Sequence, residues 1–353
     1  MGRQTRIAAV GSSLPGRIVP NSYFESIVET SDQWIQERTG IKERRFAGPG
    51  ESTASLSAEA AALALRRAGV GPESVDLLII ATCTPERSIP STAAFVQSRL
   101  GMSCPSFDLN AACAGYVYGL SVADAQIRAG AADRVMLVGA EVLSRVLDMT
   151  DRTTCVLFGD GAGATLLEAS DEPGVIDSLL ALDGGQAELL TVPAGGSGEP
   201  ITAESLAQRR NFLRMLDGQA VFKQAVTAMA DACRQVLDKA GLSSDDVKLA
   251  IGHQANARIL SALGKRLGLK PERVLIDIAH VGNTSAASIP IALDRAWSRG
   301  LLEAGDVVLT AAFGAGMAWG ANVVKWSIPP LAGASSSEAI SPEESQRSEG
   351  SPA

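Results

Sequence analysis

The chain has 353 residues, 46% of them hydrophobic and 20% charged, a composition typical of a folded globular protein and not of a wholly disordered chain. This length predicts two domains or one duplicated unit. The net charge of −8 argues against nonspecific binding to nucleic acids or anionic membranes, because both require an excess of basic residues.

The N-terminal sequence lacks the apolar core of a signal peptide, and no apolar run is long enough to cross a membrane. We therefore expect a cytoplasmic protein. The five cysteines are an odd number and include no C-x-x-C pair, which predicts neither a disulfide framework nor a zinc site. The remaining question is whether one of these thiols is a nucleophile.

The predicted elements repeat along the chain. Residues 64–80 and 236–252 share a pattern of helix, glycine cap, turn and apolar strand, and Gly69 corresponds to Gly241, 172 positions later. Residues 107–109 (FDL) likewise match 276–278 (IDI), so we expect a strand in both places. The pattern predicts two similar α/β halves, 1–174 and 175–328, with helices on both faces of each sheet. The remaining segment, 329–353, is rich in Ser, Pro and Glu and predicts a disordered tail.

Cys113 lies where the first of these matching strands gives way to a long apolar helix that ends near Arg128. Free amide groups and the dipole at a helix N-terminus stabilise a thiolate and lower a cysteine pKa from about 8.5 towards 7. We therefore expect Cys113 to be a nucleophile, although a buried structural cysteine is the alternative. The same structural interpretation holds for the other four cysteines: Cys83, Cys104, Cys155 and Cys233.

In the second half, His253 follows the repeated strand 247–251, at the kind of strand end where α/β sheets bind ligands. Asn283 lies 170 residues after Cys113, which predicts the equivalent turn of the other half, facing Cys113 across one site. Taken alone, Asn283 would be interpreted as a helix N-cap and His253 as structural. The other histidine, His280, is interpreted as structural.

Eight motifs occur in one order along the chain. They are 31–41 (SDQWIQERTGI), 110–115 (NAACAG), 151–154 (DRTT), 158–164 (FGDGAGA), 217–223 (DGQAVFK), 253–256 (HQAN), 282–288 (GNTSAAS) and 313–316 (FGAG). Together they resemble β-ketoacyl-acyl-carrier-protein synthase III of the thiolase superfamily, over about residues 5–326.

This resemblance implies an α/β thiolase-like fold in which two pseudo-symmetric halves sandwich buried helices between their central sheets. It implies condensation of an acyl-CoA with malonyl-acyl-carrier protein, initiating fatty-acid synthesis in a cytoplasmic homodimer without metal or other cofactor. Cys113 would carry the acyl group as a thioester. His253 and Asn283 would bind the malonyl thioester oxygen, and the backbone amides of Cys113 and Ala315 the acyl carbonyl.

The resemblance also implies binding residues. Those for coenzyme A and its pantetheine arm are Thr30, Trp34, Arg38, Arg152, Gly218, Phe222 and Asn256. Those for the acidic carrier protein are Lys223, Gln254, Ala255, Asn256, Ala257, Arg258, Lys265 and Arg266. Ile89, where a Phe is common in the family, would reach the partner subunit's acyl pocket and act with Leu143 as a gate that admits longer or branched starters.

Two alternatives remain open at this stage. A thiolase-fold starter-unit or acyl-transfer enzyme of a polyketide or other secondary-metabolite pathway would share the Cys-His-Asn triad but use another donor or acceptor. A noncatalytic thiolase-fold scaffold would be expected to have lost part of the triad, and all three residues are present.

Overall fold

The computed structural model describes residues 2–330, so the predicted tail falls, from residue 331, outside the described residues. Two main sheets form the molecule. The first has the strand order β1 (Gln4–Ser13), β7 (Gly161–Ser170), β6 (Arg134–Glu141), β4 (Leu77–Ala81), β5 (Ser106–Leu109). The second has the order β11 (Val247–Gly252), β12 (Val307–Gly314), β13 (Ala318–Lys325), β8 (Val175–Leu182). The first sheet thus uses strands before residue 171 and the second uses strands after residue 174, while the division into domains at 174/175 stays a prediction.

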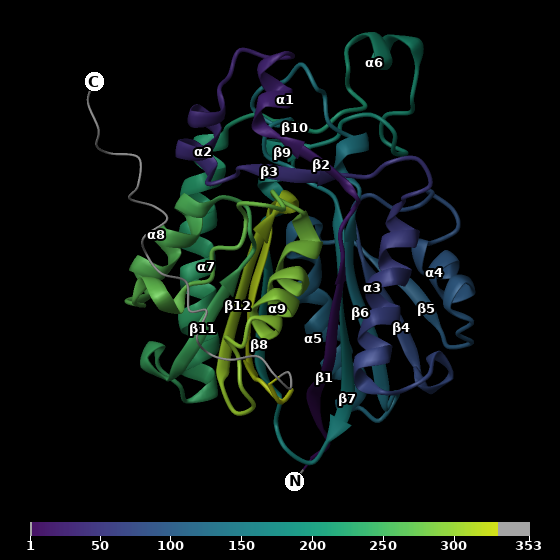
Figure 1. The fold of residues 1–353 in the computed structure, drawn as a ribbon, viewed down its shortest axis with the longest axis vertical. Helices are drawn as coiled ribbons and strands as arrows, with labels where there is room; N and C mark the ends of the chain where they lie inside the picture. The colour runs from purple at the N-terminus through teal and green to yellow at the C-terminus, as the bar shows by residue number, and fades with distance from the viewer. Residues whose placement is uncertain (1, 331–353) are drawn as a thin grey trace, which may run out of the picture.

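Helices form three layers with these sheets. Between the sheets lie α5 (Gly115–Arg128) and α9 (Ser288–Ser298), which Figure 1 shows in the middle of the molecule. Outside them, α3 (Thr53–Ala68) and α4 (Thr92–Leu100) cover the first sheet, and α7 (Gly218–Ala240) and α8 (Ala257–Leu267) cover the second. A single apolar core joins α5 and α9 to strands of both sheets, through residues such as Tyr116 and Ile289. The predicted layering, with helices sandwiched between two sheets, is confirmed.

The glycine caps of the repeat form as predicted. Gly69 and Gly241 end α3 and α7, and both adopt the left-handed conformation with a φ of 69°. Each is followed by a short 3₁₀ turn, η1 (Pro72–Ser74) or η5 (Ser244–Asp246), and then by the buried strand β4 or β11. Because only glycine adopts this backbone without steric cost, these two positions mark where each helix ends.

The strand predicted at residues 276–278 does not form. This part of the chain makes one isolated bridge to β11, between Val274 and Ala250. The Gln254 side chain takes the place of a partner strand: its amide donates to the Leu275 carbonyl, and its carbonyl oxygen accepts the Asp277 backbone N–H at 2.7 Å. Asp277 is turned instead towards two arginines of α9 and its C-terminus, Arg295 and Arg299.

One end of the molecule carries the remaining short elements, at the top of Figure 1. They are the antiparallel pair β2 (Arg17–Pro20) and β3 (Glu43–Phe46), the helices α1 (Asn21–Glu25), α2 (Asp32–Thr39) and α6 (Ala203–Ala207), and the pair β9 (Leu190–Thr191) and β10 (Arg214–Met215). They lie over the end of the sheets at which the site described below is found. Within residues 2–330, none of the helices combines the length and apolarity that crossing a membrane requires.

Candidate active site

Two matching turns face each other at the centre of the molecule. The 3₁₀ turns η2 (Ala112–Ala114) and η7 (Ser285–Ala287) lead directly into α5 and α9. Ala112 and Ser285, which open these turns, both have positive φ angles, 45° and 49°. A Cβ atom on Gly115 would lie 3.3 Å from that of Ala286, so the two turns are packed against one another.

This geometry corrects the predicted correspondence between Cys113 and Asn283. The turn that begins at Ala112 recurs at Ser285, a difference of 285 − 112 = 173 residues, so the counterpart of Cys113 is Ala286. Asn283 therefore precedes its turn, as Asn110 precedes the other. Both asparagines use their side-chain oxygen alike: Asn110 accepts the Ala112 N–H at 3.1 Å, and Asn283 accepts the Ser285 N–H at 2.9 Å.

Asn283 is fixed through its backbone and its side-chain oxygen. Its N–H donates to the Leu157 carbonyl, and its own carbonyl accepts the Gly159 N–H at 2.9 Å. Because the side-chain oxygen is occupied by Ser285, the amide nitrogen is the part of the side chain left for a ligand. The buried Asn283 thus offers two N–H donors at the cavity that it lines.

His253 begins the loop after β11, and its N–H donates to the Ala311 carbonyl of β12 at 2.7 Å. The ring is buried, and its Nδ1 lies 2.7 Å from the Ser288 hydroxyl at the start of α9. Burial lowers the pKa of His253 to about 4. The imidazole is therefore neutral at physiological pH and able to act as a hydrogen-bond donor without a net charge.

Cys113 lies in the η2 turn, and the loop after β12 is pressed against it. A Cβ atom on Gly314 would come within 2.7 Å of the Cys113 backbone nitrogen, so only glycine allows this approach. Burial raises the pKa of the Cys113 thiol to about 12, and the neighbouring Glu141 carboxylate acts in the same direction. Burial thus acts against the lowering of this pKa that is expected at a helix N-terminus.

A cavity of 140 Å³ brings Cys113, His253 and Asn283 together. It is also lined by three residues predicted to bind the pantetheine arm: Gly218, Phe222 and Asn256. The remaining walls are mostly apolar: Leu157, Phe158, Leu190, Met215, Val221, Ala225, Ala255, Ile259, Phe313 and Gly314. A more open hollow of 500 Å³ lies beyond Phe313, between α7 and Trp319. Its lining does not include Cys113, His253 or Asn283.

Aromatic and cationic side chains gather where α2, α8 and the loop before β7 meet. Ser31 caps α2 by accepting the Trp34 N–H at 3.1 Å. The Arg152 guanidinium lies 5.1 Å from the centre of the Trp34 ring, and that of Arg38 lies 5.9 Å from it. Asn256 joins α8 to α2, because its amide donates to the Arg38 carbonyl at 2.9 Å while its oxygen caps α8.

Four of the cations predicted to meet a carrier protein are exposed: Lys223, Arg258, Lys265 and Arg266. Arg258 also lies over the Phe222 ring, 6.0 Å from its centre. None of the ion pairs of residues 2–330 uses these four side chains. Their charges are thus not neutralised by an ion pair within the described residues.

Other predicted site residues lie elsewhere. Gln254 is 1% exposed and is bonded within the fold, so its prediction as a carrier-protein contact is wrong. Ala257 packs against Gly40. Thr30 lies outside the cavity lining, and Ala315 follows Gly314 in the turn η8 (Ala315–Met317). Within one chain, the structure does not bring Ile89, which is 87% exposed, to the buried Leu143 or to the cavity.

Three polar residues behind the site were not predicted from the sequence: Glu141, Ser285 and Ser288. Glu141, buried at the end of β6, accepts hydrogen bonds from the Ser285 hydroxyl at 3.1 Å and from the Thr84 hydroxyl at 2.5 Å. A single acidic residue closing the apolar run 135–141 is a signal that could have identified it. Both serines lie inside the motif 282–288 but carry no signature of their own. The described residues contain no cluster of His, Cys, Asp or Glu placed to hold a metal ion.

Two family models match the chain. The family described as 3-oxoacyl-[acyl-carrier-protein (ACP)] synthase III matches residues 107–184, and its C-terminal counterpart matches residues 237–326. The chain is 47% identical to a β-ketoacyl-[acyl-carrier-protein] synthase III of Roseiflexus sp. (strain RS-1), over 93% of this chain and 100% of that protein.

Solved structures give the same result. The 3-oxoacyl-(acyl carrier protein) synthase III of Pseudomonas aeruginosa PAO1 is similar with a TM-score of 0.86 and 41% identity, over 93% of this chain and 100% of that one. The priming β-ketosynthase of the R1128 polyketide biosynthetic pathway is similar with a TM-score of 0.87 and 34% identity, over 93% and 98%. The chain, an acyl-transferring condensing enzyme with the thiolase fold, belongs to the β-ketoacyl-[acyl-carrier-protein] synthase III family.

Proposed function

We propose that this enzyme joins an acyl-CoA starter to malonyl-acyl-carrier protein, giving 3-oxoacyl-acyl-carrier protein and CO₂, and thereby initiates fatty-acid synthesis. One observation carries the proposal: a thiol, an imidazole and an amide, from Cys113, His253 and Asn283, line one small cavity with apolar walls. The free thiols of its five cysteines are in keeping with a reducing, cytoplasmic location.

In the first half-reaction the sulfur of Cys113 attacks the thioester carbonyl of acyl-CoA. A new C–S bond forms, the C–S bond to coenzyme A breaks, and the thiol proton leaves on the coenzyme A sulfur. The backbone N–H groups of Cys113 and Ala315 are proposed to stabilise the oxyanion, and the contact between Gly314 and Cys113 supports this role. The acyl group is then held as a thioester of unchanged reactivity.

In the second half-reaction the malonyl thioester loses CO₂, and the electron pair of the broken C–C bond passes into an enolate. The enolate oxygen needs neutral or positive hydrogen-bond donors, which Nε2 of His253 and Nδ2 of Asn283 supply. The enolate carbon attacks the acyl carbonyl, the new C–C bond forms, and Cys113 leaves as a thiolate that regains a proton. Removing one such donor costs about 10²–10³ in rate at comparable sites.

Binding of both substrates is proposed at the mouth of this cavity. Trp34 and Arg152 are proposed to stack on the adenine ring, with Arg38 near the phosphates, and the contacts of both arginines with the Trp34 ring support this. The exposed cations of α7 and α8 are proposed to bind the acidic carrier protein. A homodimer is proposed as well. The edge strand β5 and the exposed side chains of Phe107 and Ile89 support it.

The test is intact-mass analysis after incubation with short acyl-CoAs. We expect one acyl group on Cys113 and none in the Cys113→Ser variant, with Cys233→Ser as the matched control that still acylates. His253→Ala and Asn283→Ala should keep some acylation but lose most decarboxylation of malonyl-carrier protein. Acylation of another cysteine, or equal and total loss of acylation in both variants, would contradict the proposal.

A second candidate function is priming of a polyketide or another secondary metabolite, which the likeness to the R1128 priming enzyme favours. The two functions use the same triad and differ in the starter and in the carrier protein. Product analysis with carrier proteins from a fatty-acid system and from a polyketide system separates them. Strong preference for a polyketide carrier protein would favour this second function.

A further inference from the structure

The hydrogen bond between His253 and Ser288 determines which ring nitrogen of the histidine carries its proton. The Ser288 hydroxyl lies 2.7 Å from Nδ1 of His253, and both residues are 2% exposed. The same hydroxyl oxygen also accepts the backbone N–H of Gln254 at 3.3 Å. Nδ1 is therefore occupied within the fold, and Nε2 is the ring nitrogen left for the cavity.

A count of protons decides the direction of this hydrogen bond. The hydroxyl has one proton to donate, and among the hydrogen bonds of residues 2–330 its acceptor is Nδ1 alone. If Nδ1 carried the ring proton, the hydroxyl proton would remain buried without an acceptor, which native structures rarely allow. With the hydroxyl as donor, Nδ1 is unprotonated.

The ring holds a single proton, because burial keeps the pKa of His253 at about 4. That proton must then be on Nε2 when Nδ1 accepts from Ser288. Nε2–H is the form that can donate to a developing oxyanion, whereas an unprotonated Nε2 would present a lone pair to it.

We propose that Ser288 is a positioning residue for the decarboxylation half-reaction, holding His253 in the tautomer whose Nε2–H donates to the enolate oxygen. This inference rests on the role proposed above for His253. It adds a requirement that the triad alone does not contain, namely a hydroxyl donor behind the imidazole.

The pseudo-symmetry of the molecule supports a role beyond folding. Ser288 is the first residue of α9, and the first residue of the matching helix α5 is Gly115, 173 positions earlier. Gly115 has no side chain to donate a hydrogen bond, yet α5 begins in the same way after the same kind of turn. Starting a helix at this place does not require a hydroxyl, so the serine is explained by what it contacts.

The direct test is ¹⁵N NMR of the enzyme labelled at histidine, which needs no substrate. The chain has two histidines, and a His280→Gln variant assigns the signals of the exposed His280 by their disappearance. We expect His253 to show a protonated Nε2 and an unprotonated Nδ1, and the Ser288→Ala variant to gain the opposite tautomer. A protonated Nδ1 in the parent enzyme would overturn the proposal.

Kinetics test the consequence. In Ser288→Ala, decarboxylation of malonyl-carrier protein should fall about tenfold, as is typical when a group orienting a catalytic ligand is lost, while acylation of Cys113 changes less than about twofold. Ser288→Thr should restore both the rate and the tautomer. Ser298→Ala removes a hydroxyl from the exposed end of the same helix and should change neither.

The outcomes separate this inference from the proposed function. Unchanged decarboxylation and an unchanged tautomer in Ser288→Ala would refute the role of Ser288 even if Cys113 is acylated as proposed. Failure of the parent enzyme to acylate Cys113 would refute the proposed function, while the NMR measurement would still report the tautomer.

Discussion

At the scale of single residues, the site holds its two ionisable triad members in their neutral forms. Burial raises the pKa of the Cys113 thiol and lowers that of the His253 imidazole. A neutral imidazole and an amide are weak bases but good donors, which suits a reaction in which CO₂ loss, not proton removal, generates the carbanion. The environment thus favours the second half-reaction and leaves the first dependent on what a bound substrate does to the thiol.

The state of the thiol can be measured by alkylation. Because burial raises the pKa of Cys113 to about 12, the thiolate fraction near neutral pH is small. We expect the rate of iodoacetamide alkylation at Cys113 to rise about tenfold per pH unit between about pH 6 and pH 10, without a plateau. Peptide mapping identifies the labelled cysteine, and free glutathione serves as the reference thiol. A plateau near neutral pH would mean that the helix N-terminus dominates, as the sequence pattern predicts.

The buried histidine predicts an acid-sensitive contribution to stability. Its pKa is about 4 when folded, against a model value of 6.5, so the unfolded state binds this proton first as the pH falls. The contribution of the neutral His253 to the free energy of unfolding is fully present above about pH 6.5. It falls by about 3 kcal/mol in total as the pH drops towards 4. In urea unfolding, the free energy of unfolding of the parent should therefore fall by this much more than that of His253→Gln between about pH 6.5 and pH 4.

The sequence predicts that residues meet at one site most readily where a residue type carries chemistry of its own. Cys113, His253 and Asn283 were identified from their types and positions, and they do line one cavity. Ser285, Ser288 and Glu141 were missed because their importance lies in which groups they contact, and serine is common in turns for other reasons. Gln254 was misassigned for the same reason, since nothing in the sequence shows that its amide replaces a strand.

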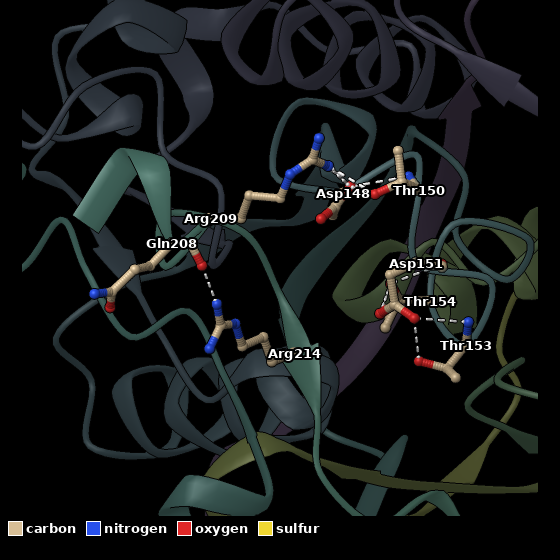
Figure 2. A network of polar contacts seen from close by, with 8 residues as sticks. All are labelled: Asp148, Thr150, Asp151, Thr153, Thr154, Gln208, Arg209 and Arg214. Carbon is tan, nitrogen blue, oxygen red and sulfur yellow. Dashed lines mark hydrogen bonds and ion pairs between the residues drawn. The ribbon is translucent and has the colours of Figure 1, made fainter. Parts of the chain in front are cut away.

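At the scale of elements, the segment from η4 (Gly184–Leu189) through β9, α6 and β10 forms part of the cavity wall and contacts the loop before β7. Leu190 and Met215 of this segment line the cavity. Figure 2 shows Arg209 reaching from it to Asp148 and Thr150, in the loop that continues to Arg152. Burial alone would raise the pKa of Asp148, but hydrogen bonds from Thr150 and the Arg209 charge lower it. The Arg209–Asp148 ion pair therefore joins the cavity wall to the loop that carries Arg152, at the expected adenine site.

We expect Asp148→Asn to affect substrate binding more than folding. The Arg209 side chain is 51% exposed, so the ion pair contributes only about 0.2–1 kcal/mol to the free energy of unfolding. A loosened segment should raise KM for acyl-CoA several-fold with little change in kcat, and should speed proteolysis within residues 184–217. A double-mutant cycle with Arg209→Gln isolates the pair, and Glu199→Gln, at another ion pair of the segment, is the control. Equal effects of all three single substitutions would count against a specific role for the Arg209–Asp148 ion pair.

The prediction of elements was most accurate where a local signal acts alone. Apolar runs and glycine caps predicted α3, β4, α7 and β11 correctly, because a helix end needs only a residue that tolerates positive φ. The strand at 276–278 failed because forming a strand requires a partner, and the Gln254 side chain occupies that place. The correspondence of Asn283 with Cys113 failed by three residues, since sequence spacing does not reveal which residue opens the turn.

At the scale of the whole molecule, the first sheet ends at an unpaired edge. The edge strand β5 carries Phe107, which is 39% exposed, and the loop before α4 carries Ile89, which is 87% exposed. An isoleucine this exposed contributes little to the stability of a single chain. In the proposed homodimer, Ile89 would close the acyl pocket of the partner and not that of its own chain.

Mixed dimers can test both the assembly and the gate. Ile89→Phe adds bulk, so it should reduce kcat/KM for branched or medium acyl-CoAs relative to acetyl-CoA by about fourfold for each methylene that no longer fits. Joining wild type to a chain with both Cys113→Ser and Ile89→Phe leaves one working site, gated by the partner's substitution, and should show the restricted ranking. Joining a Cys113→Ser chain to an Ile89→Phe chain leaves one working site gated by isoleucine, and should show the parent's ranking. The reverse pattern would place the gate within one chain.

A monomeric enzyme, or a parent that already prefers acetyl-CoA with a ranking unchanged by Ile89→Phe, would remove Ile89 from substrate selection.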